Sequence, residues 1–203
     1  MYTLYWSPGS ASMAPQAVLE EIGVPFKLAR VDLSKPRSAA YLELNPDGRV
    51  PTLAGDGETI FEAAAIVMHL ADRHPEAKLA PTPSETERGL YYQWLLYLAD
   101  TLQPAFMRYY RCNEYSGDPA AAPSVKTQAL AHVTQVWKNL DTALAGKPYL
   151  LGDRFSAADI YLHMLYTWGP DMAELAKTRP NLTRTFRRVD ERPAVKRMME
   201  TNA

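Results

Sequence analysis

Hydroxyl side chains that could bind a ligand are concentrated near the start of the chain. Tyr5 lies in an alternating segment, and Ser10 and Ser12 follow it across the turn Ser7-Pro8-Gly9. Taken alone, each has an ordinary structural explanation: Tyr5 packs in a strand, Ser10 is a solvated turn residue, and Ser12 caps the next helix. Glu62 also has two interpretations. An acid at a helix start either compensates the helix dipole or pairs with a positively charged ligand group.

Residue counts and spacing exclude several other chemistries. Cys112 is the only cysteine, so no internal disulfide can form, and without a C-x-x-C pair dithiol exchange is excluded. The single thiol indicates a reducing compartment and makes the cytoplasm the expected location, with Cys112 itself a bystander. The histidines show no metal-ligand spacing, and we expect no metal site. They are His69, His74, His132 and His163.

The composition is that of an ordinary globular protein. The chain has 203 residues, is 47% hydrophobic and carries 22 Lys+Arg against 23 Asp+Glu, a formal net charge of −1. This balance argues against nucleic acid as a partner, because binding to nucleic acid usually requires a basic excess. No segment approaches the roughly 20 apolar residues of a membrane span. Residues 1–8 lack the basic and apolar regions of a signal peptide, and none is expected.

The first elements predicted along the chain are strand, helix and strand. Loose alternation over residues 2–7 predicts a short strand that ends at the turn. Ala14, Val18 and Ile22 recur at helical spacing. Residues 26–33 predict a second strand, parallel to the first because a helix connects the two.

A second group of elements follows directly. Residues 36–44 predict a short helix, and residues 50–53 and 59–61 flank Gly55-Asp56-Gly57, a strong hairpin signal. Helical periodicity returns from Glu62 to Asp72. The first part of the chain is therefore a mixed βαβ–ββα unit.

Beyond this unit the strand signals vanish. Residues 74–84 contain three prolines and no periodicity, which is typical of an interdomain linker. Apolar residues then recur only at helical spacing, and Ser156 with Asp159 forms a capping box before a helix over residues 160–168. We expect an α/β domain at residues 1–77, a linker at 78–86 and an all-α domain at 87–203.

These features together resemble the cytosolic glutathione transferases, and bacterial members near the beta class in particular. The resemblance implies a thioredoxin-like N-terminal domain followed by an all-helical domain, and a homodimer. The residues that carry it are Tyr5-Trp6-Ser7-Pro8-Gly9-Ser10, Asn45-Pro46-Asp47-Gly48-Arg49-Val50-Pro51-Thr52-Leu53, Phe61-Glu62-Ala63, Phe155-Ser156-Ala157-Ala158-Asp159 and Arg192-Pro193-Ala194-Val195.

The resemblance implies a detoxifying enzyme that joins the thiolate of its co-substrate, glutathione, to small hydrophobic electrophiles. A free thiol with a pKa of about 8.5 is mostly protonated at neutral pH, and lowering that pKa by about two units requires about 2.7 kcal/mol. A hydroxyl donor at a helix start is sufficient in magnitude. Serine-type relatives place this donor where Ser10 stands, while Ser12 and Tyr5 are the alternatives.

The resemblance also implies how glutathione is held. A cis Val50-Pro51 bond would turn the Val50 backbone toward the cysteinyl part of the tripeptide. Glu62 would pair with the γ-glutamyl ammonium group, and the backbone N–H of Ala63 would bind the carboxylate. Relatives carry Ser or Thr where Ala63 stands, so glutathione binding is expected to be weak. Arg49 is a further expected contact, with the glycyl carboxylate.

One departure limits the possible reactions. Beta-class relatives carry a cysteine in the first turn, where this chain has Ala11. A mixed disulfide at that position is impossible, so the reactive sulfur must arrive with glutathione. Two alternatives stay open: a specialised glutathione-dependent isomerase, dehalogenase or etherase, and a non-catalytic binding protein on the same scaffold.

Aromatic residues of the helical domain are candidates for a pocket that receives the electrophile. Tyr109 and Tyr110 are the better candidates, because adjacent tyrosines on one helix cannot both face the same core. Phe106 and Trp168 complete the expected set.

Overall fold

The computed structural model describes all residues, 1–203, and divides into two compact units. The first contains Met1–Arg88 together with Val189–Ala203, and the second contains Gly89–Arg188. The sequence pattern grouped residues 189–203 with the helical domain, whereas in the structure they pack within the first unit. None of the helices is long and apolar enough to span a membrane.

The first unit is built on a four-stranded mixed sheet with the strand order β2-β1-β3-β4. β1 pairs in parallel with β2 and antiparallel with β3, which pairs antiparallel with β4. Its elements are β1 (Tyr2–Trp6), α1 (Met13–Ile22), β2 (Phe26–Arg30), α2 (Ala39–Leu44), β3 (Thr52–Gly55), β4 (Glu58–Phe61), α3 (Ala63–Arg73), a 3-10 turn (Pro75–Ala77) and α10 (Pro193–Asn202). The predicted βαβ–ββα order is confirmed.

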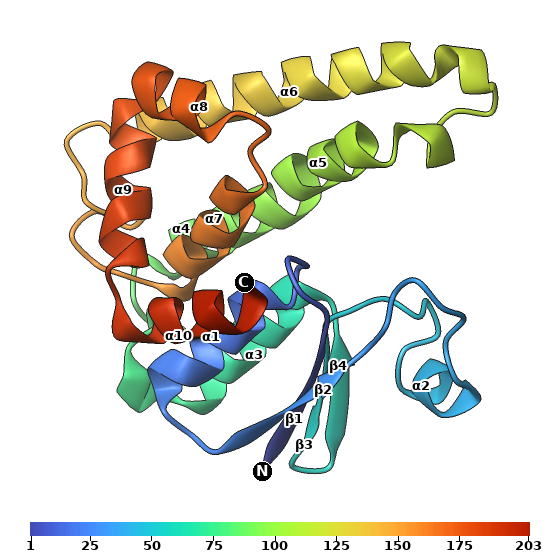
Figure 1. Ribbon diagram of the computed structural model, residues 1–203. Helices are drawn as coiled ribbons and strands as arrows, with labels where there is room; N and C mark the ends of the chain where they lie inside the picture. The colour runs from blue at the N-terminus through green and yellow to red at the C-terminus, as the bar shows by residue number, and fades with distance from the viewer. The chain divides into compact units, whose positions relative to one another are not determined.

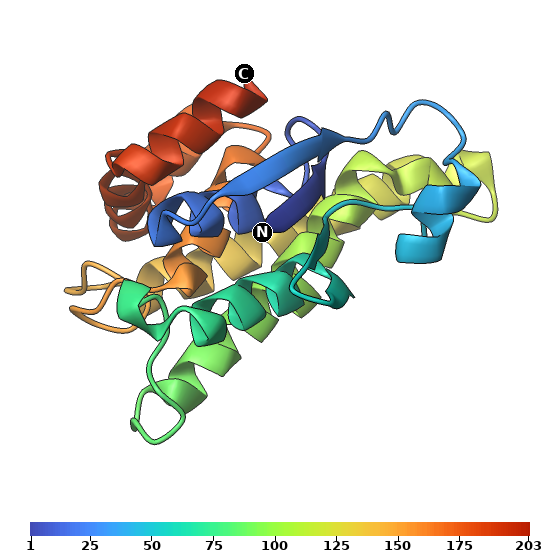
Figure 2. The same ribbon diagram turned by 90° about the horizontal axis from the view of Figure 1, so that it is seen from below.

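Helices α1 and α3 pack on each other and on the sheet. Helix α2 lies apart from them, across the strands (Figure 1). The same arrangement is visible from below (Figure 2). The helical spacing of the sequence explains this packing: Val18 on α1 and Ile66 on α3 are fully buried, as is Leu4 on β1.

The second strand is shorter than the sequence pattern predicted. It ends at Arg30 rather than near residue 33. Asp32 begins a side-chain turn in which its carboxylate accepts from the Ser34 N–H at 3.0 Å. The Arg37 guanidinium donates to the carbonyls of Asp32, at 2.6 Å, and Leu33, at 2.9 Å. These carbonyls therefore bond to a side chain and not to a neighbouring strand.

Helix α10 lies beside α1 although 170 residues separate them in the chain (Figure 1). Arg192 binds Glu21 through two parallel hydrogen bonds of 2.6 and 2.8 Å. One turn further, Arg197 binds Glu20 at 2.6 Å. A paired guanidinium–carboxylate contact of this kind is both strong and directional, so it fixes where the start of α10 lies on α1.

The second unit is all-helical, as predicted. Its helices are α4 (Arg88–Leu96), α5 (Gln103–Tyr110), α6 (Ala122–Ala143), α7 (Ala157–Thr167), α8 (Met172–Thr178) and α9 (Pro180–Asp190), with 3-10 turns at Cys112–Glu114 and Pro119–Ala121. Apolar residues recur at every fourth position from Leu90 to Leu102, which indicates helix. Within this stretch a π-helical segment, Tyr97–Leu102, joins α4 to α5. Such segments keep the helix continuous but shift the face that follows.

Asp159 is a buried capping residue at the start of α7. Its carboxylate accepts hydrogen bonds from the Leu150 N–H at 2.8 Å, the Ser156 N–H at 2.9 Å and the Ser156 hydroxyl at 3.0 Å. Burial nevertheless dominates and raises the pKa of Asp159 to about 6. The capping box predicted from Ser156 and Asp159 is confirmed.

Candidate functional site

The turn between β1 and α1 brings two serine hydroxyls together. Gly9 adopts a left-handed φ of +63°, which glycine tolerates best, and lets the chain reverse before Ser10. The Ser10 Oγ lies 2.7 Å from both the Ser7 carbonyl and the Ser12 Oγ. Ser10 is partly exposed, so its hydroxyl can reach a ligand.

Ser12 does not cap α1 in the way the sequence suggested. It occupies the N-cap position, but its backbone is helical (φ −69°, ψ −16°) and its side chain makes no bond to the helix. The usual cap geometry requires an extended backbone. The Ser12 hydroxyl instead turns back to the Ser7 carbonyl, at 3.2 Å, and is completely buried. A ligand cannot contact it directly.

Tyr5 packs as a strand residue. Its ring centroid lies 5.3 Å from that of Tyr41, a normal distance for an aromatic pair. Tyr41 in turn donates to the Arg49 carbonyl at 2.6 Å, and burial raises the pKa of its hydroxyl. Tyr5 therefore supports the segment that precedes β3.

The Val50-Pro51 peptide bond is cis, as predicted. The carbonyl before Val50, that of Arg49, accepts from Tyr41 and also from the Asn45 side chain at 3.0 Å. The Asn45 amide also reaches the Thr52 hydroxyl at 3.1 Å. Asn45 belongs to the segment that carries the family resemblance, but nothing in the sequence indicated its contacts or those of Tyr41. The Arg49 side chain is exposed.

Helix α3 begins with an unusual backbone conformation. Glu62 has a φ of +73°, a left-handed value that is uncommon for a residue other than glycine, and its side chain is exposed. Its carboxylate makes no cap bond to α3. Ala63, the first residue of the helix, is buried. Its N–H and the next ones therefore have no side-chain partner within the helix cap, which suits an anion.

Strand register places these three features at one edge of the sheet. Tyr5 lies opposite Thr52, and Thr52 lies opposite Phe61. Because β3 runs against both neighbours, the segment after Tyr5, the Pro51 before Thr52 and the Glu62 after Phe61 all leave the sheet at the same end. The serine turn, the cis bond and the start of α3 thus border one site.

Two family models match the chain. One is described as "Glutathione S-transferase, N-terminal domain" and matches residues 1–72; the other, "Glutathione S-transferase, C-terminal domain", matches residues 99–202. The chain belongs to the glutathione S-transferase family. The serine turn, the cis Val50-Pro51 bond and the start of α3 all lie within the matched N-terminal domain.

Individual relatives place this transferase near the bacterial beta class. "Glutathione S-transferase GstA" of Escherichia coli O157:H7 is 30% identical over 95% of this chain and 94% of that relative. A sphingomonad glutathione S-transferase, solved in complex with glutathione, is 33% identical with a TM-score of 0.85 over 98% of each chain. A beta-class transferase from Sphingomonas chungbukensis is 32% identical with a TM-score of 0.86, covering 99% of this chain and 98% of that one.

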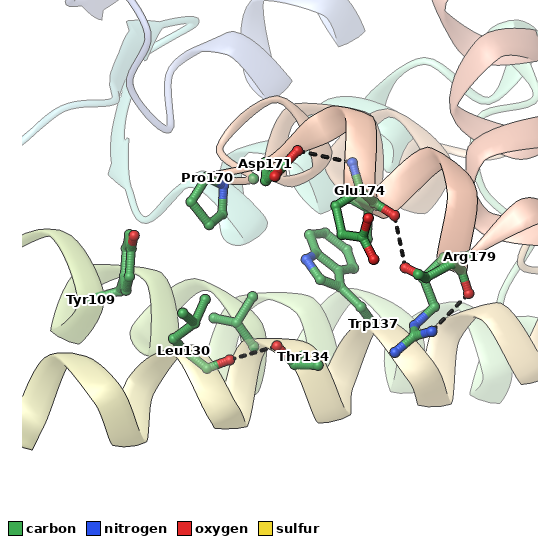
Figure 3. A pocket seen from close by; sticks show the side chains of 12 residues that line it. Tyr109, Leu130, Thr134, Trp137, Pro170, Asp171, Glu174 and Arg179 are labelled. Carbon is green, nitrogen blue, oxygen red and sulfur yellow. Dashed lines mark hydrogen bonds between the residues drawn. The ribbon is translucent and has the colours of Figure 1, made fainter.

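The helical unit of this transferase contains a cavity of about 510 Å³ between α5, α6 and α8 (Figure 3). Tyr109 is the one of the four expected pocket residues that lines it. Its wall is apolar along α6, where Val133 and Trp137 are buried, and is charged at Glu174 and Arg179. A volume of this size is typical of small-molecule sites.

The other three aromatic residues lie elsewhere in the same unit. Phe106 is fully buried, with its ring 6.2 Å from that of Tyr110 and 6.1 Å from that of Trp168. Tyr110 is exposed and donates to the Trp168 carbonyl at 2.5 Å. These contacts make Phe106 part of the helical core and leave Tyr110 and Trp168 closer to solvent.

Cys112 is half-exposed and forms no disulfide. It stands in the 3-10 turn Cys112–Glu114, in the helical unit. The structure shows no group of three His, Cys, Asp or Glu side chains that could hold a metal ion.

Proposed function

We propose that this chain conjugates reduced glutathione to small hydrophobic electrophiles, with Ser10 as the hydrogen-bond donor to the thiolate. The observation that carries this proposal is the convergence of the serine turn, the cis Val50-Pro51 bond and the left-handed Glu62 at one edge of the sheet. Glutathione offers one group for each: a thiol, a peptide backbone and a γ-glutamyl zwitterion.

The hydroxyl pair explains how Ser10 can donate a hydrogen bond to a ligand. The Ser7 carbonyl has two hydroxyl neighbours, Ser10 at 2.7 Å and Ser12 at 3.2 Å. When Ser10 turns its O–H to a sulfur anion, Ser12 still satisfies that carbonyl. The Ser7 carbonyl therefore keeps a donor, and the bond from Ser10 to an anion is stronger than the one it replaces.

The remaining contacts would orient the tripeptide. The Val50 backbone would pair with the cysteinyl residue, and Arg49 would approach the glycyl carboxylate. Glu62 would bind the γ-glutamyl ammonium group, and the free N–H groups at Ala63 would bind the carboxylate beside it.

The chemical step is then nucleophilic substitution or addition. The thiol proton leaves to solvent, and the Ser10 hydroxyl stabilises the remaining thiolate. The sulfur forms a bond to an electrophilic carbon, and the electron pair of the broken bond leaves with the displaced group or stays on the adduct. Tyr109, Tyr110 and Trp168 are the residues we propose for the electrophile. Phe106 supports them from the core.

We further propose that the chain works in the cytoplasm as a homodimer. The family resemblance supports both statements, and the single cysteine supports a reducing compartment. Along the sequence we propose an α/β domain at residues 1–77, a linker at 78–86 and a helical domain at 87–203, from which α10 returns to pack in the first unit.

Ala63 favours one second candidate, a binding protein without transferase activity. Its side chain cannot supply the hydroxyl that relatives offer the γ-glutamyl carboxylate. Turnover of a small hydrophobic electrophile with glutathione separates the two candidates, and isothermal titration with reduced glutathione and with S-hexylglutathione tests the binding of glutathione itself. We expect heat with both ligands; no heat at millimolar concentration contradicts any glutathione-dependent function.

Ser10→Ala tests the catalytic assignment. The pKa of bound glutathione, followed by thiolate absorbance, should rise by about one to two units, because a hydrogen bond to a charged group is worth about 1.5–3 kcal/mol. Tyr5→Phe is the matched control, since it also removes one hydroxyl from the same strand and turn. An unchanged pKa in Ser10→Ala together with a raised one in Tyr5→Phe or Ser12→Ala would reassign the donor.

A further inference from the structure

We infer that Asn202, on α10, is a positioning residue for the thiolate site. It acts by holding the backbone of the serine turn, residues 7–12, at Gly9. This inference rests on the proposed function of Ser10 and adds a residue about 190 positions away in the sequence.

The contact is direct and its polarity is defined. The Gly9 N–H donates to the Asn202 Oδ1 at 3.2 Å. The Asn202 Nδ2 donates to the Met198 carbonyl at 2.8 Å and to the Gln16 Oε1 at 3.0 Å. Because Met198 offers only an acceptor and Gly9 only a donor, the side-chain amide has one satisfactory orientation.

Asn202 connects the serine turn to helix α1, whose relative position sets where the Ser10 hydroxyl lies. Gln16 is completely buried on α1, four residues after Ser12. One amide group therefore binds the turn before α1 and the first part of α1 at the same time. A shift of the turn relative to the helix would break one of the two bonds.

Gly9 is the residue of the turn that most needs such a restraint. Glycine has the widest choice of backbone conformations, and a Cβ added at Gly9 would meet no atom within 4 Å. No neighbouring atom therefore packs against this side of Gly9. The donor, Ser10, follows it directly, so freedom at Gly9 moves the Ser10 hydroxyl.

The position of Asn202 is in turn set by α10. The ion pairs Arg192–Glu21 and Arg197–Glu20 bind this helix along α1. Asn202 lies on the last turn of α10, one helical turn beyond Met198. The helix thus presents the amide at a fixed place, as a preorganised site requires.

Asn202→Ala tests this inference, with Thr201→Ala as the matched control. Thr201 is next to Asn202 and bonds only to its own helix, at the Arg197 carbonyl. We expect Asn202→Ala to raise the pKa of the bound glutathione thiol by about half to one unit and to lower kcat several-fold with little change in KM for glutathione. Thr201→Ala should match the wild type.

Two further measurements separate positioning from a general loss of structure. Hydrogen exchange of a peptide covering residues 7–12 should become faster in Asn202→Ala without glutathione, while exchange in β2 and β4 stays the same. In the Ser10→Ala background, Asn202→Ala should add no further change in thiol pKa, because the effect passes through Ser10.

The possible failures are distinguishable. If the wild type binds no glutathione, the proposed function fails and this inference fails with it. If the wild type binds glutathione and Ser10→Ala raises the thiol pKa, but Asn202→Ala behaves like Thr201→Ala, only the inference is wrong. An additive effect of Asn202→Ala in the Ser10→Ala background also contradicts it.

Discussion

At the scale of single residues, burial distinguishes two serines that the sequence left as alternatives. Ser10 and Ser12 lie two residues apart, and their hydroxyls touch. The helical φ and ψ of Ser12 turn its side chain into the core, while Ser10 stays partly exposed. A ligand can therefore meet only Ser10 directly.

Ala63→Ser should strengthen glutathione binding. The new hydroxyl would lie at the first position of α3, where the γ-glutamyl carboxylate is proposed to bind, and a hydrogen bond is worth about 0.5–1.5 kcal/mol. We expect Kd to fall by about 2- to 10-fold, measured by isothermal titration.

Ala65→Ser is the control for this change, because it places the same hydroxyl in the same helix two residues further on. Its Kd should equal that of the wild type. A Kd that falls equally in both variants would mean that the hydroxyl acts on the helix rather than on glutathione.

At the scale of elements, the buried cap of α7 makes stability depend on pH. The pKa of Asp159 is raised from 3.8 to about 6 in the folded protein because burial disfavours the charge. Between these values the folded protein holds a proton that the unfolded chain has released. The stability that Asp159 contributes is therefore complete below about pH 4 and is lost as the pH rises to about 6.

Asp159→Asn should remove this pH dependence. The free energy of unfolding of the wild type minus that of the variant should fall by about 2 kcal/mol from pH 4 to pH 7, measured by urea unfolding at several pH values. Asp171→Asn is the matched control, because Asp171 caps α8 with a similar bond, 2.8 Å to the Glu174 N–H, but is exposed. The same course in both variants would contradict burial as the cause.

Most elements could be predicted because their signals are local. Helical spacing located α1, α3 and α7, and Gly55-Asp56-Gly57 located the β3–β4 hairpin. The π-helical segment at residues 97–102 could not be predicted, since apolar spacing alone does not reveal one extra residue in a turn.

The candidate site also has features that the sequence predicts and features that it does not. The cis Val50-Pro51 bond was predicted from a motif, because the motif itself contains the residues concerned. The contacts of Tyr41 with Arg49, and of Asn202 with Gly9, join segments whose proximity depends on the completed fold. No spacing within one segment carries that information.

At the scale of the whole molecule, the first unit is assembled from both ends of the chain. Its sheet and its helices α1 to α3 come from residues 1–88, and α10 comes from residues 189–203. The main ion pair between α10 and α1 joins Arg192 to Glu21, and the Glu21 side chain is only 12% exposed.

Arg192→Gln should therefore destabilise the first unit more than Arg197→Gln does. Removing Arg192 leaves a mostly buried carboxylate without its paired bonds, and we expect a loss of about 2–3 kcal/mol in the free energy of unfolding. The Arg197–Glu20 pair is more exposed, and its loss should cost less than about 1 kcal/mol.

Urea unfolding followed by far-UV circular dichroism measures both effects, and the thiol pKa of bound glutathione provides a second comparison. Equal losses in the two variants would show that burial of Glu21 does not matter. A loss confined to Arg197→Gln would contradict the assignment of Arg192 as the main connection.

The return of α10 to α1 also has a consequence for protein synthesis. The ribosome completes residues 1–88 and must then translate the 100 residues of the helical unit, 89–188, before α10 exists. At about 5–20 residues per second this interval lasts about 5–20 s. During that time the nascent first unit carries an uncovered face on α1, including Gln16, together with a Gly9 turn that lacks its hydrogen bond to Asn202. The proposed thiolate site is therefore among the last parts of this protein to form, and a chaperone that covers α1 during translation would have to release it before glutathione can bind.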